Sequence, residues 1–314
     1  MKKPLIIIAG PTASGKTNLS VELAKRINGE IISADSMQVY RHMNIGTAKV
    51  TKREEQGIKH YLIDVIDPRD PFNIHIFQQM AKVAIEEILA KGKVPILVGG
   101  TGFYIQAILY DISFDETQVD NSYRNSLELL AAENGNQYLH NLLKEVDEES
   151  FNKIHANNVK RVIRALEYYK QTGSPISKHN EEEKKKCSPY NYLFYMLNMD
   201  RQLLYNRIDQ RVDDMFAKGL IEEVSELKNR GYTKELVSMQ GLGYKETFAY
   251  LENECNLEEA KYIIKRDTRH FAKRQLTWFR REKNIRWLNL EEFEFNVENI
   301  LDKIIKDIEE IEFL

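Results

Sequence analysis

The stretch GPTASGKT, residues 10–17, directly follows the apolar run LIIIA at residues 5–9. It matches the phosphate-loop pattern G-x-x-x-x-G-K-[ST], in which glycines allow a tight turn whose backbone N–H groups point at a phosphate. Because a strand pattern precedes the loop and a helical pattern follows it, we predict a phosphate-binding site. The residues expected to surround the phosphates are Gly10, Pro11, Thr12, Ala13, Ser14, Gly15, Lys16 and Thr17.

The first 110 residues alternate short apolar runs with longer amphipathic patterns. Apolar runs typical of buried strands lie at 5–9, 30–33, 60–66 and 94–99. Helical spacing of apolar residues is found at 16–27 and 73–92. This alternation predicts an α/β fold of the P-loop NTPase-like kind, in which a parallel sheet is covered by helices.

The pattern changes after residue 113. Polar helical segments follow one another from about 115 to 189, and the charged run EEEKKK at 181–186 indicates a solvated linker or a helix end. Later strands are expected at 192–199 and 285–289. The tail after 290 is expected to form a packing helix. We therefore predict an α/β core with C-terminal helices and a helical insertion domain. The core covers 1–113 and 190–314, and the insertion covers 114–189.

The composition describes an ordinary globular chain. Of its 314 residues, 42% are hydrophobic and 30% are charged, which allows a sizeable core. The two cysteines, Cys187 and Cys255, are too few for a disulfide framework and indicate a reducing cytoplasm. No segment approaches the roughly 20 apolar residues of a membrane span. The net charge of −3 argues against an indiscriminate nucleic-acid binder but leaves a local basic surface open. We expect a cytoplasmic protein, by default a monomer without an obligate protein partner.

Two further turns follow predicted strands. Asp35 comes after the run at 30–33, at the carboxyl end of a strand, where ligands bind in such sheets. Its alternative role is a helix N-cap. Gln38 in the same turn carries the donor and acceptor that an adenine edge requires. In GGTG at 99–102, the glycines allow a ligand to approach and Thr101 offers a hydroxyl, although a plain strand-to-helix connection is the alternative. Three turns are thus expected to converge on one cleft.

The phosphate loop alone does not distinguish ATP from another diphosphate. An enzyme that uses a nucleoside triphosphate would need a second metal-binding aspartate at a strand end. Asp64 is a candidate, but a strand-end turn explains it equally well. ATP is therefore allowed without being supported, and an ATP-dependent small-molecule kinase remains the alternative function. A phosphate-loop RNA-binding protein without chemistry is the third possibility.

Several segments identify a family when they are taken together and in order. They are GPTASGKT, ISADSMQVYRHMNIGTAK, HYLIDVIDP, VGGTGFYIQAIL, RVIRALEYY, LYNRIDQRVDDMFAKGLIEEV, QGLGYKE and FAKRQLTWFRRE. From about residue 4 to about residue 290 the chain resembles the bacterial tRNA dimethylallyltransferases, also called tRNA isopentenylpyrophosphate transferases. The resemblance implies that the loop holds the diphosphate of dimethylallyl diphosphate. It also implies transfer of the dimethylallyl group to N6 of adenosine 37, next to the anticodon, in tRNAs that read codons beginning with U.

The chemistry suggests roles on each side of the new bond. An adenine N6 amine is a weak nucleophile, so Asp35 is expected to accept its proton as a general base. Thr101 is a candidate hydrogen-bond partner of the diphosphate or the nucleophile. Lys16, the loop amides and Thr17 with Mg²⁺ would stabilise the departing diphosphate. The catalytic candidates are thus Asp35, Thr101 and Lys16, with Thr17 as the metal ligand.

A pair of arginines offers a further diphosphate contact. Arg207 and Arg211 stand one helical turn apart and would extend the diphosphate clamp. Their alternative is a solvated helix face on which they pair with nearby aspartates.

A basic segment near the C-terminus offers a surface for RNA. Residues 265–286 contain nine Lys or Arg and two acids, interleaved with aromatic residues that we expect to face mostly inward. The basic residues that share one helical face are Arg266, Arg269, Lys273 and Arg280. Together with the resemblance, this segment implies the anticodon stem-loop of tRNA as partner, contacted also by the insertion. The expected tRNA-binding residues are Asp35, Ser36, Met37, Gln38, Thr101, Arg124, Lys160, Arg161, Val162, Ile163, Arg164, Gln240, Gly241, Leu242, Gly243, Tyr244, Lys245, Lys273 and Arg280, of which Arg124 matches the family most loosely.

Overall fold

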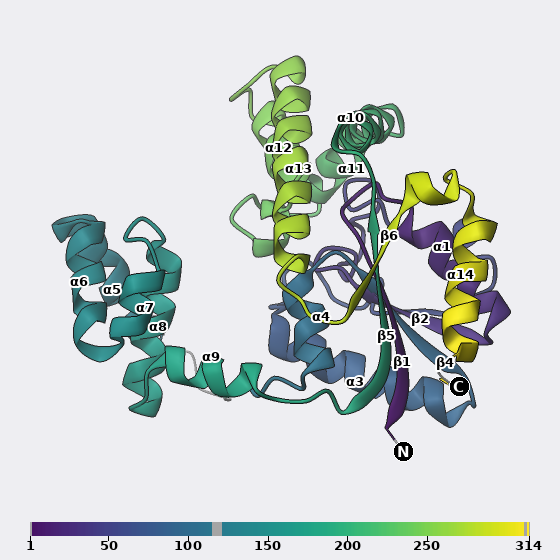
Figure 1. Ribbon diagram of the computed structural model, residues 1–314. Helices are drawn as coiled ribbons and strands as arrows, with labels where there is room; N and C mark the ends of the chain where they lie inside the picture. Colours follow the sequence, from purple (N-terminus) through teal and green to yellow (C-terminus); the bar gives the residue numbers. More distant parts are fainter. Residues whose placement is uncertain (1, 115–120, 311–312, 314) are drawn as a thin grey trace. The chain divides into compact units, whose positions relative to one another are not determined.

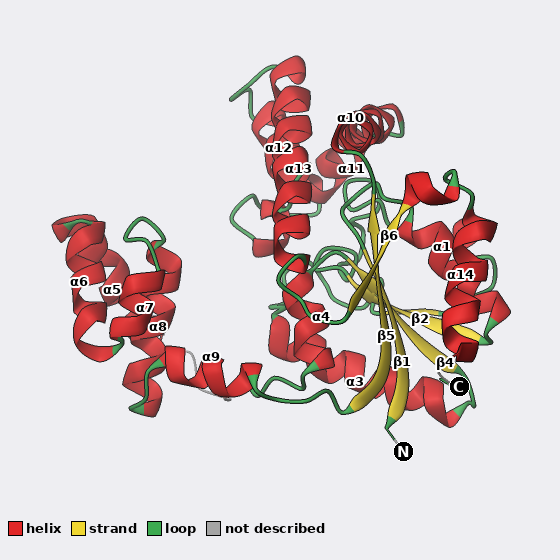
Figure 2. Ribbon diagram, in the orientation of Figure 1, coloured by secondary structure: helices red, strands yellow, loops and turns green. Residues whose placement is uncertain are grey.

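The computed structural model describes residues 2–114, 121–310 and 313. Within them, six strands form a sheet in the order β3-β2-β4-β1-β5-β6, with every neighbouring pair parallel (Figures 1 and 2). This confirms the predicted fold class. The strands are β1 (Lys3–Ala9), β2 (Gly29–Ala34), β3 (His60–Tyr61), β4 (Val94–Gly99), β5 (Tyr190–Asn198) and β6 (Ile285–Asn289).

The sheet largely follows the predicted runs, with β3 as the exception. β4 and β6 coincide with the runs at 94–99 and 285–289. The run at 60–66 was expected to be one strand, but only His60–Tyr61 pairs with β2. Leu62 and Asp64 have positive φ angles of 62° and 57°, which extended backbone does not allow. The segment therefore leaves the sheet, and Ile66 then pairs with Tyr40 through an isolated parallel bridge outside the sheet strands.

The helices of the unit that contains the sheet lie against the sheet or beside it. They are α1 (Lys16–Arg26), α2 (Lys52–Glu55), α3 (Ile74–Ala90), α4 (Gly102–Leu109), α10 (Arg201–Ala217), α11 (Leu220–Asn229), α12 (Tyr244–Leu251), α13 (Leu257–Phe279) and α14 (Val297–Glu310), with 3-10 turns at Val237–Gln240 and Leu290–Phe293. The tail forms the expected packing helix, since α14 lies beside α1 (Figure 1) and pairs with it through Arg26, Glu298 and Asp302.

Side-chain caps fix where two important helices begin. The Asp200 carboxylate accepts from the N–H groups of Gln202 and Leu203 at the start of α10. α13 begins with a capping box in which Asn256 and Glu259 each accept from the other's backbone N–H. Such a cap contributes about 1 kcal/mol. Both helices reach the site described below.

Contacts divide the chain into two compact units, Met1–Leu109 with Pro189–Leu314, and Tyr110–Ser188. The second unit is helical and contains α5 (Asn121–Asn134), α6 (Asn136–Val146), α7 (Glu148–Lys153), α8 (Val159–Thr172) and α9 (Ile176–Lys184). Its own core contains Leu127, Leu139 and Leu143. The charged run at 181–186 includes the end of α9. Across the described residues, no helix combines the length and apolarity needed to cross a membrane.

Candidate active site

The phosphate loop connects β1 to α1 through a tight backbone turn. Ala13 and Gly15 have positive φ angles of 63° and 90°, a region that glycine enters freely and other residues rarely. Lys16 Nζ donates to the carbonyl oxygens of Gly10, at 2.8 Å, and Pro11, at 2.7 Å. The lysine side chain therefore folds back over its own loop.

Two cations and a carboxylate influence one another beside this loop. Burial, with a further contribution from the positive charge of Arg211, lowers the pKa of Lys16 from 10.5 to about 7, while the charge of Asp35 acts in the opposite direction. Burial also lowers the pKa of Arg211. An incoming polyanion would offset the repulsion between the two cations. The arrangement is suited to binding a diphosphate.

Asp35 lies directly after β2 and has two different carboxylate oxygens. Its Oδ1 accepts from the backbone N–H groups of Met37, at 2.8 Å, and Gln38, at 3.3 Å. These bonds stabilise a turn, and the N-cap alternative is wrong because no helix begins here. Its Oδ2 accepts no hydrogen bond from the described residues. One oxygen thus holds the side chain in place while the other is available to accept a proton.

A cavity of about 370 Å³ brings the three predicted turns together. Thr12 of the phosphate loop, Asp35 and Thr101 line it, and Arg211 reaches it from α10. The apolar lining residues of α10 and α13 are Ile208, Val212, Met215, Ile264 and Phe271. Polar groups suited to phosphate and base chemistry therefore share one space with an apolar wall, as is usual for small-molecule sites.

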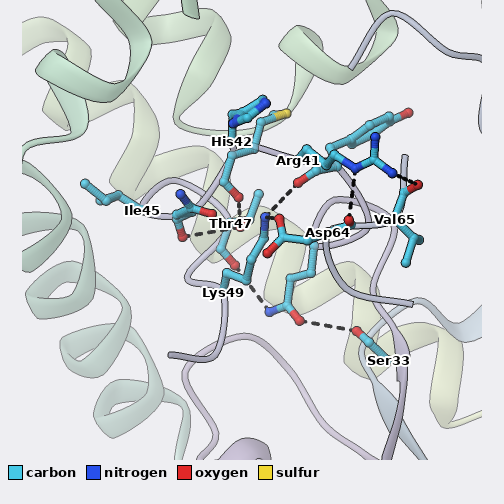
Figure 3. Close-up of polar contacts among 12 residues, drawn as sticks. Ser33, Arg41, His42, Ile45, Thr47, Lys49, Asp64 and Val65 are labelled. Atoms are coloured by element: carbon cyan, nitrogen blue, oxygen red, sulfur yellow. Dashed lines mark hydrogen bonds and ion pairs between the residues drawn. The ribbon is translucent and has the colours of Figure 1, made fainter. Parts of the chain in front are cut away.

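The segment after Asp35 is held from inside by Gln38. Its Nε2 donates to the carbonyl oxygens of Thr47, at 3.4 Å, and Ala48, at 3.3 Å, and its Oε1 accepts from Ser33 Oγ at 3.2 Å (Figure 3). Both ends of the amide thus bind protein groups, and Gln38 does not line the cavity. Gln38 thus braces the segment, and its contact with adenine stays a prediction.

Asp64 serves the same segment and does not face the phosphate loop. Its carboxylate pairs with the buried ammonium of Lys49, which also donates to the Tyr40 carbonyl at 2.7 Å (Figure 3). Arg41 donates to the carbonyl oxygens of Asp64, at 3.2 Å, and Val65, at 3.1 Å. The strand-end turn is therefore the better explanation of Asp64.

Glu223 of α11 holds the tip of this segment. Its carboxylate accepts from the backbone N–H groups of Asn44, at 2.9 Å, Ile45, at 2.8 Å, and Gly46, at 3.2 Å. The buried Tyr244 hydroxyl donates to it at 2.7 Å. A Cβ at Gly46 would lie 2.5 Å from the Tyr244 ring, so only glycine fits there. The sequence does not single out Glu223, because nothing local distinguishes it from an exposed helix residue.

A family model identifies this chain. The model for IPP transferase matches residues 38–282. The chain belongs to the IPP transferase family. The match begins at the braced segment and ends after the basic helix, so it includes most of the cavity lining.

Individual members of the IPP transferase family match nearly the whole chain. The tRNA dimethylallyltransferase of Lachnoclostridium phytofermentans is 57% identical over 312 residues, covering 99% of each chain. That of Acetivibrio thermocellus is 52% identical over 304 residues, covering 97% of this chain and 96% of its own. These relatives confirm the resemblance seen in the sequence, and none of them favours the kinase alternative.

Solved structures agree with these relatives. The full-length tRNA isopentenylpyrophosphate transferase of Bacillus halodurans is 44% identical, with a TM-score of 0.74 and 98% of each chain covered. A eukaryotic dimethylallyltransferase acting on tRNA is 31% identical, with a TM-score of 0.76, and the match covers 91% of this chain and 74% of that one.

The two arginines that were predicted to clamp the diphosphate have different surroundings. Arg211 lines the cavity. Arg207 instead lies with its guanidinium 5.0 Å from the centre of the Phe295 ring, and it is not among the cavity-lining residues. The two positions lie one turn apart, about 6 Å along the helix axis, and only Arg211 reaches the site.

The residues of the helical unit that were expected to contact tRNA differ in their exposure. Val162 and Ile163 are 0% and 3% exposed and pack in the core of that unit, so their side chains do not face solvent, and their contact with tRNA stays a prediction. Lys160, Arg161 and Arg164 are exposed on the other face of α8, as helical amphipathicity requires.

Arg124 has a structural partner that its sequence context does not reveal. Its guanidinium forms two hydrogen bonds with the buried carboxylate of Glu167, at 2.9 Å and 2.8 Å. This pair ties α5 to α8, and the tRNA contact of Arg124 stays a prediction.

The basic face of α13 is only partly available. Arg266 pairs with Asp267 at 2.8 Å, and Arg269 pairs with Asp209. Lys273 and Arg280 are exposed and have no ion-pair partner among the described residues. Of the aromatic residues, Phe279 is buried against Phe194, as expected.

The segment 240–245 lies at the cavity. Gln240, Gly241, Leu242, Tyr244 and Lys245 all line it. Gly243, with φ of 93°, provides the turn before α12.

The glycines of the 99–102 turn make room for protein, not for a ligand. A Cβ at Gly100 would lie 2.1 Å from Nε2 of Gln275, and one at Gly102 would lie 2.2 Å from the Trp278 ring. The expected ligand approach is therefore wrong at these two positions, because side chains of α13 already occupy that space.

Two kinds of cavity residue were missed in the sequence. Arg274 and Thr268 line it from α13, but they lay among many other polar residues. The apolar members Ile208, Val212 and Met215 follow helical spacing, which is also what an ordinary core face shows. Their only signal is their position beside Arg211.

Proposed function

We propose that this protein transfers a dimethylallyl group from dimethylallyl diphosphate to N6 of adenosine 37, next to the anticodon, in tRNAs that read codons beginning with U. The products are N6-(dimethylallyl)adenosine in tRNA and diphosphate. The observation that supports this most is the shared cavity, in which Thr12 of a phosphate loop, Asp35 and Thr101 meet an apolar wall. Two relatives named tRNA dimethylallyltransferase, 57% and 52% identical, support the same reaction.

The phosphate loop would hold the leaving group. As the allylic C–O bond lengthens, negative charge collects on the diphosphate. Lys16 and Arg211 lie close enough for their charges to act on each other, and both would stabilise the charge that develops on the diphosphate. The bond that breaks thus leaves its electron pair with a group that the loop is built to bind.

Mg²⁺ fits this side of the site. No cluster of three or more His, Cys, Asp or Glu that could hold a metal lies within the described residues, but Mg²⁺ is usually bound by phosphate oxygens, water and few protein ligands. The exposed Thr17 at the start of α1 suits that single role. When bound, the ion would neutralise charge on the diphosphate.

The turn after β2 would act on the adenine. N6 attacks the allylic carbon and loses a proton, which Asp35 Oδ2 is positioned to accept. Thr101 lines the same cavity and offers a hydroxyl to the diphosphate or the base. The base must first leave its stack, which costs a few kcal/mol, and contacts of Lys273, Arg280 and the exposed face of α8 with RNA would offset that cost.

A transfer assay tests the proposal. Purified protein is incubated with radiolabelled dimethylallyl diphosphate, magnesium and an unmodified tRNA whose loop contains A36-A37-A38, without ATP. We expect label on A37, and none on a tRNA in which A37 is replaced by G. Strict dependence on ATP, or transfer of a phosphoryl group, would instead indicate the kinase. We further expect the protein to be cytoplasmic and monomeric. Size-exclusion chromatography with light scattering tests the oligomeric state.

A further inference from the structure

Gln275 of α13 connects two segments that line the cavity. Its side chain is buried, with 7% of the residue exposed. Its Oε1 accepts from the backbone N–H of Thr12 at 3.1 Å, and its Nε2 donates to the carbonyl oxygen of Gly100 at 3.0 Å. These partners are 263 and 175 residues away in the sequence. One planar amide therefore spans the phosphate loop and the turn after β4.

The two backbone groups lie at, or directly before, a hydroxyl residue of the site. The bonded N–H is that of Thr12 itself, and the bonded carbonyl directly precedes Thr101. Thr12 and Thr101 line the same cavity. Since the donor and acceptor of an amide keep a fixed separation, Gln275 sets the spacing of these two residues.

Gly100 shows that the fit is close. A Cβ at this position would lie 2.1 Å from Nε2 of Gln275 and 3.2 Å from the carbonyl oxygen of Gly10. Gly100 has no positive φ that would require glycine. Its lack of a side chain is therefore explained by the approach of Gln275, and the two residues act as a matched pair.

We propose that Gln275 is a positioning residue for the transfer reaction. It holds the diphosphate loop at Thr12 in register with Thr101, so that the allylic carbon and the nucleophile meet at the right separation. The same contact links the loop to α13, whose exposed residue Lys273 lies two positions away. Misplacement of this kind lowers turnover rather than RNA affinity. The inference rests on the proposed function for its assay.

The test compares two buried glutamines. Gln275→Met keeps the approximate side-chain length and removes both hydrogen bonds. We expect kcat to fall about tenfold or more, with the tRNA Kd unchanged. Gln78→Met is the matched control, because Gln78 is also buried and donates to the Ala107 carbonyl at 2.7 Å but lies outside the cavity lining. It should lower the melting temperature and leave kcat unchanged.

A double-mutant cycle makes the test independent of that one variant. Gly100→Ala alone should lower kcat, because its methyl group displaces Gln275. In a Gln275→Ala background the approach to Nε2 is removed and only the 3.2 Å approach to the Gly10 carbonyl oxygen remains, so Gly100→Ala should cost less there than in the unmodified protein. Additive losses would overturn the inference, as would a Gln275→Met protein that loses only stability or only tRNA affinity. Absence of transfer by the unmodified protein would instead contradict the proposed function.

Discussion

The two sides of the cavity are built in different ways. The phosphate loop occupies residues 10–17 and is shaped by its backbone and by Lys16, which bonds to carbonyl groups of the same loop. The segment after Asp35 is held by distant side chains, and Glu223 lies 177 to 179 residues from the N–H groups that bind it. The phosphate loop takes its shape mostly from local contacts, with Gln275 as one distant partner at Thr12, whereas the segment after Asp35, on the adenine side, depends on side chains from distant parts of the unit.

Replacing Asp35 with Asn should have the largest effect on the adenine side. The amide oxygen still accepts from Met37 and Gln38, so the turn is kept, but the second position becomes an NH₂ group that accepts no proton. We expect turnover to fall by about 10²-fold to 10⁴-fold, the usual contribution of a general base. Single-turnover transfer and tRNA binding are measured together. Lost binding with normal residual turnover would contradict the role of base.

Removing Glu223 tests whether the adenine side depends on a distant anchor. Glu223→Ala leaves three backbone N–H groups and the Tyr244 hydroxyl without their acceptor, so we expect the free energy of unfolding to fall by about 1–3 kcal/mol. Affinity for tRNA should fall as well, while affinity for dimethylallyl diphosphate stays unchanged. Urea unfolding and two binding titrations measure these quantities.

A control for this variant lies on the same helix. Glu226 is 58% exposed and pairs with Arg230 at 2.9 Å, so Glu226→Ala should cost no more than about 1 kcal/mol. Glu223→Gln, which keeps one oxygen, should fall between the two. If Glu223→Ala and Glu226→Ala lowered the free energy of unfolding by the same small amount, the segment after Asp35 would not depend on its distant anchor.

The same difference explains what the sequence could predict. Some features are determined by residues that are neighbours in the sequence. They are the phosphate loop, the strands at 94–99 and 285–289, and the position of Asp35 after a strand. Fold class and the convergence of three turns follow from them, because carboxyl ends of parallel strands share one edge of the sheet.

The remaining features depend on partners that sequence order does not reveal. Gln38 carries the groups that an adenine contact needs, yet Ser33 and the carbonyls of Thr47 and Ala48 use them. Gly100 has the pattern of a ligand-binding turn, but Gln275 fills the space. In both cases the chemistry of the residue was clear, and only the fold determines which partner it meets.

Lys16 provides a pH test of the phosphate side. With a pKa of about 7, the free side chain is mostly uncharged at pH 8.5, and a bound diphosphate would restore the charge. Binding of dimethylallyl diphosphate at pH 8.5 should therefore take up as much as about one proton, which calorimetry in two buffers of different ionisation enthalpy measures. Lys16→Met should bind more weakly and take up none. Equal uptake by both proteins would assign the proton elsewhere.

The same shift affects how stability depends on pH, in the same direction as a carboxylate whose pKa is lowered on folding. The unfolded lysine keeps its proton up to about its ordinary pKa of 10.5, whereas the folded one loses it near 7. The unfolded state therefore binds more protons between these values, and Lys16 makes the folded protein more stable as pH rises through that range. In Lys16→Met this rise should be smaller.

Removing the exposed cations of α13 should have the smallest effect. This prediction extends the comparison to the binding of RNA. Lys273 and Arg280 bind phosphates through charge alone, so removing both should lower the slope of log K against log salt by about 1.4 to 1.8. The variant should bind tRNA more weakly at low salt and approach the unmodified protein as salt rises. Arg266→Ala is the control, because Arg266 is already paired with Asp267 and should change the slope less. A defect of equal size at every salt concentration would mean that the double variant disturbs the fold of α13, and that these cations do not form the RNA surface.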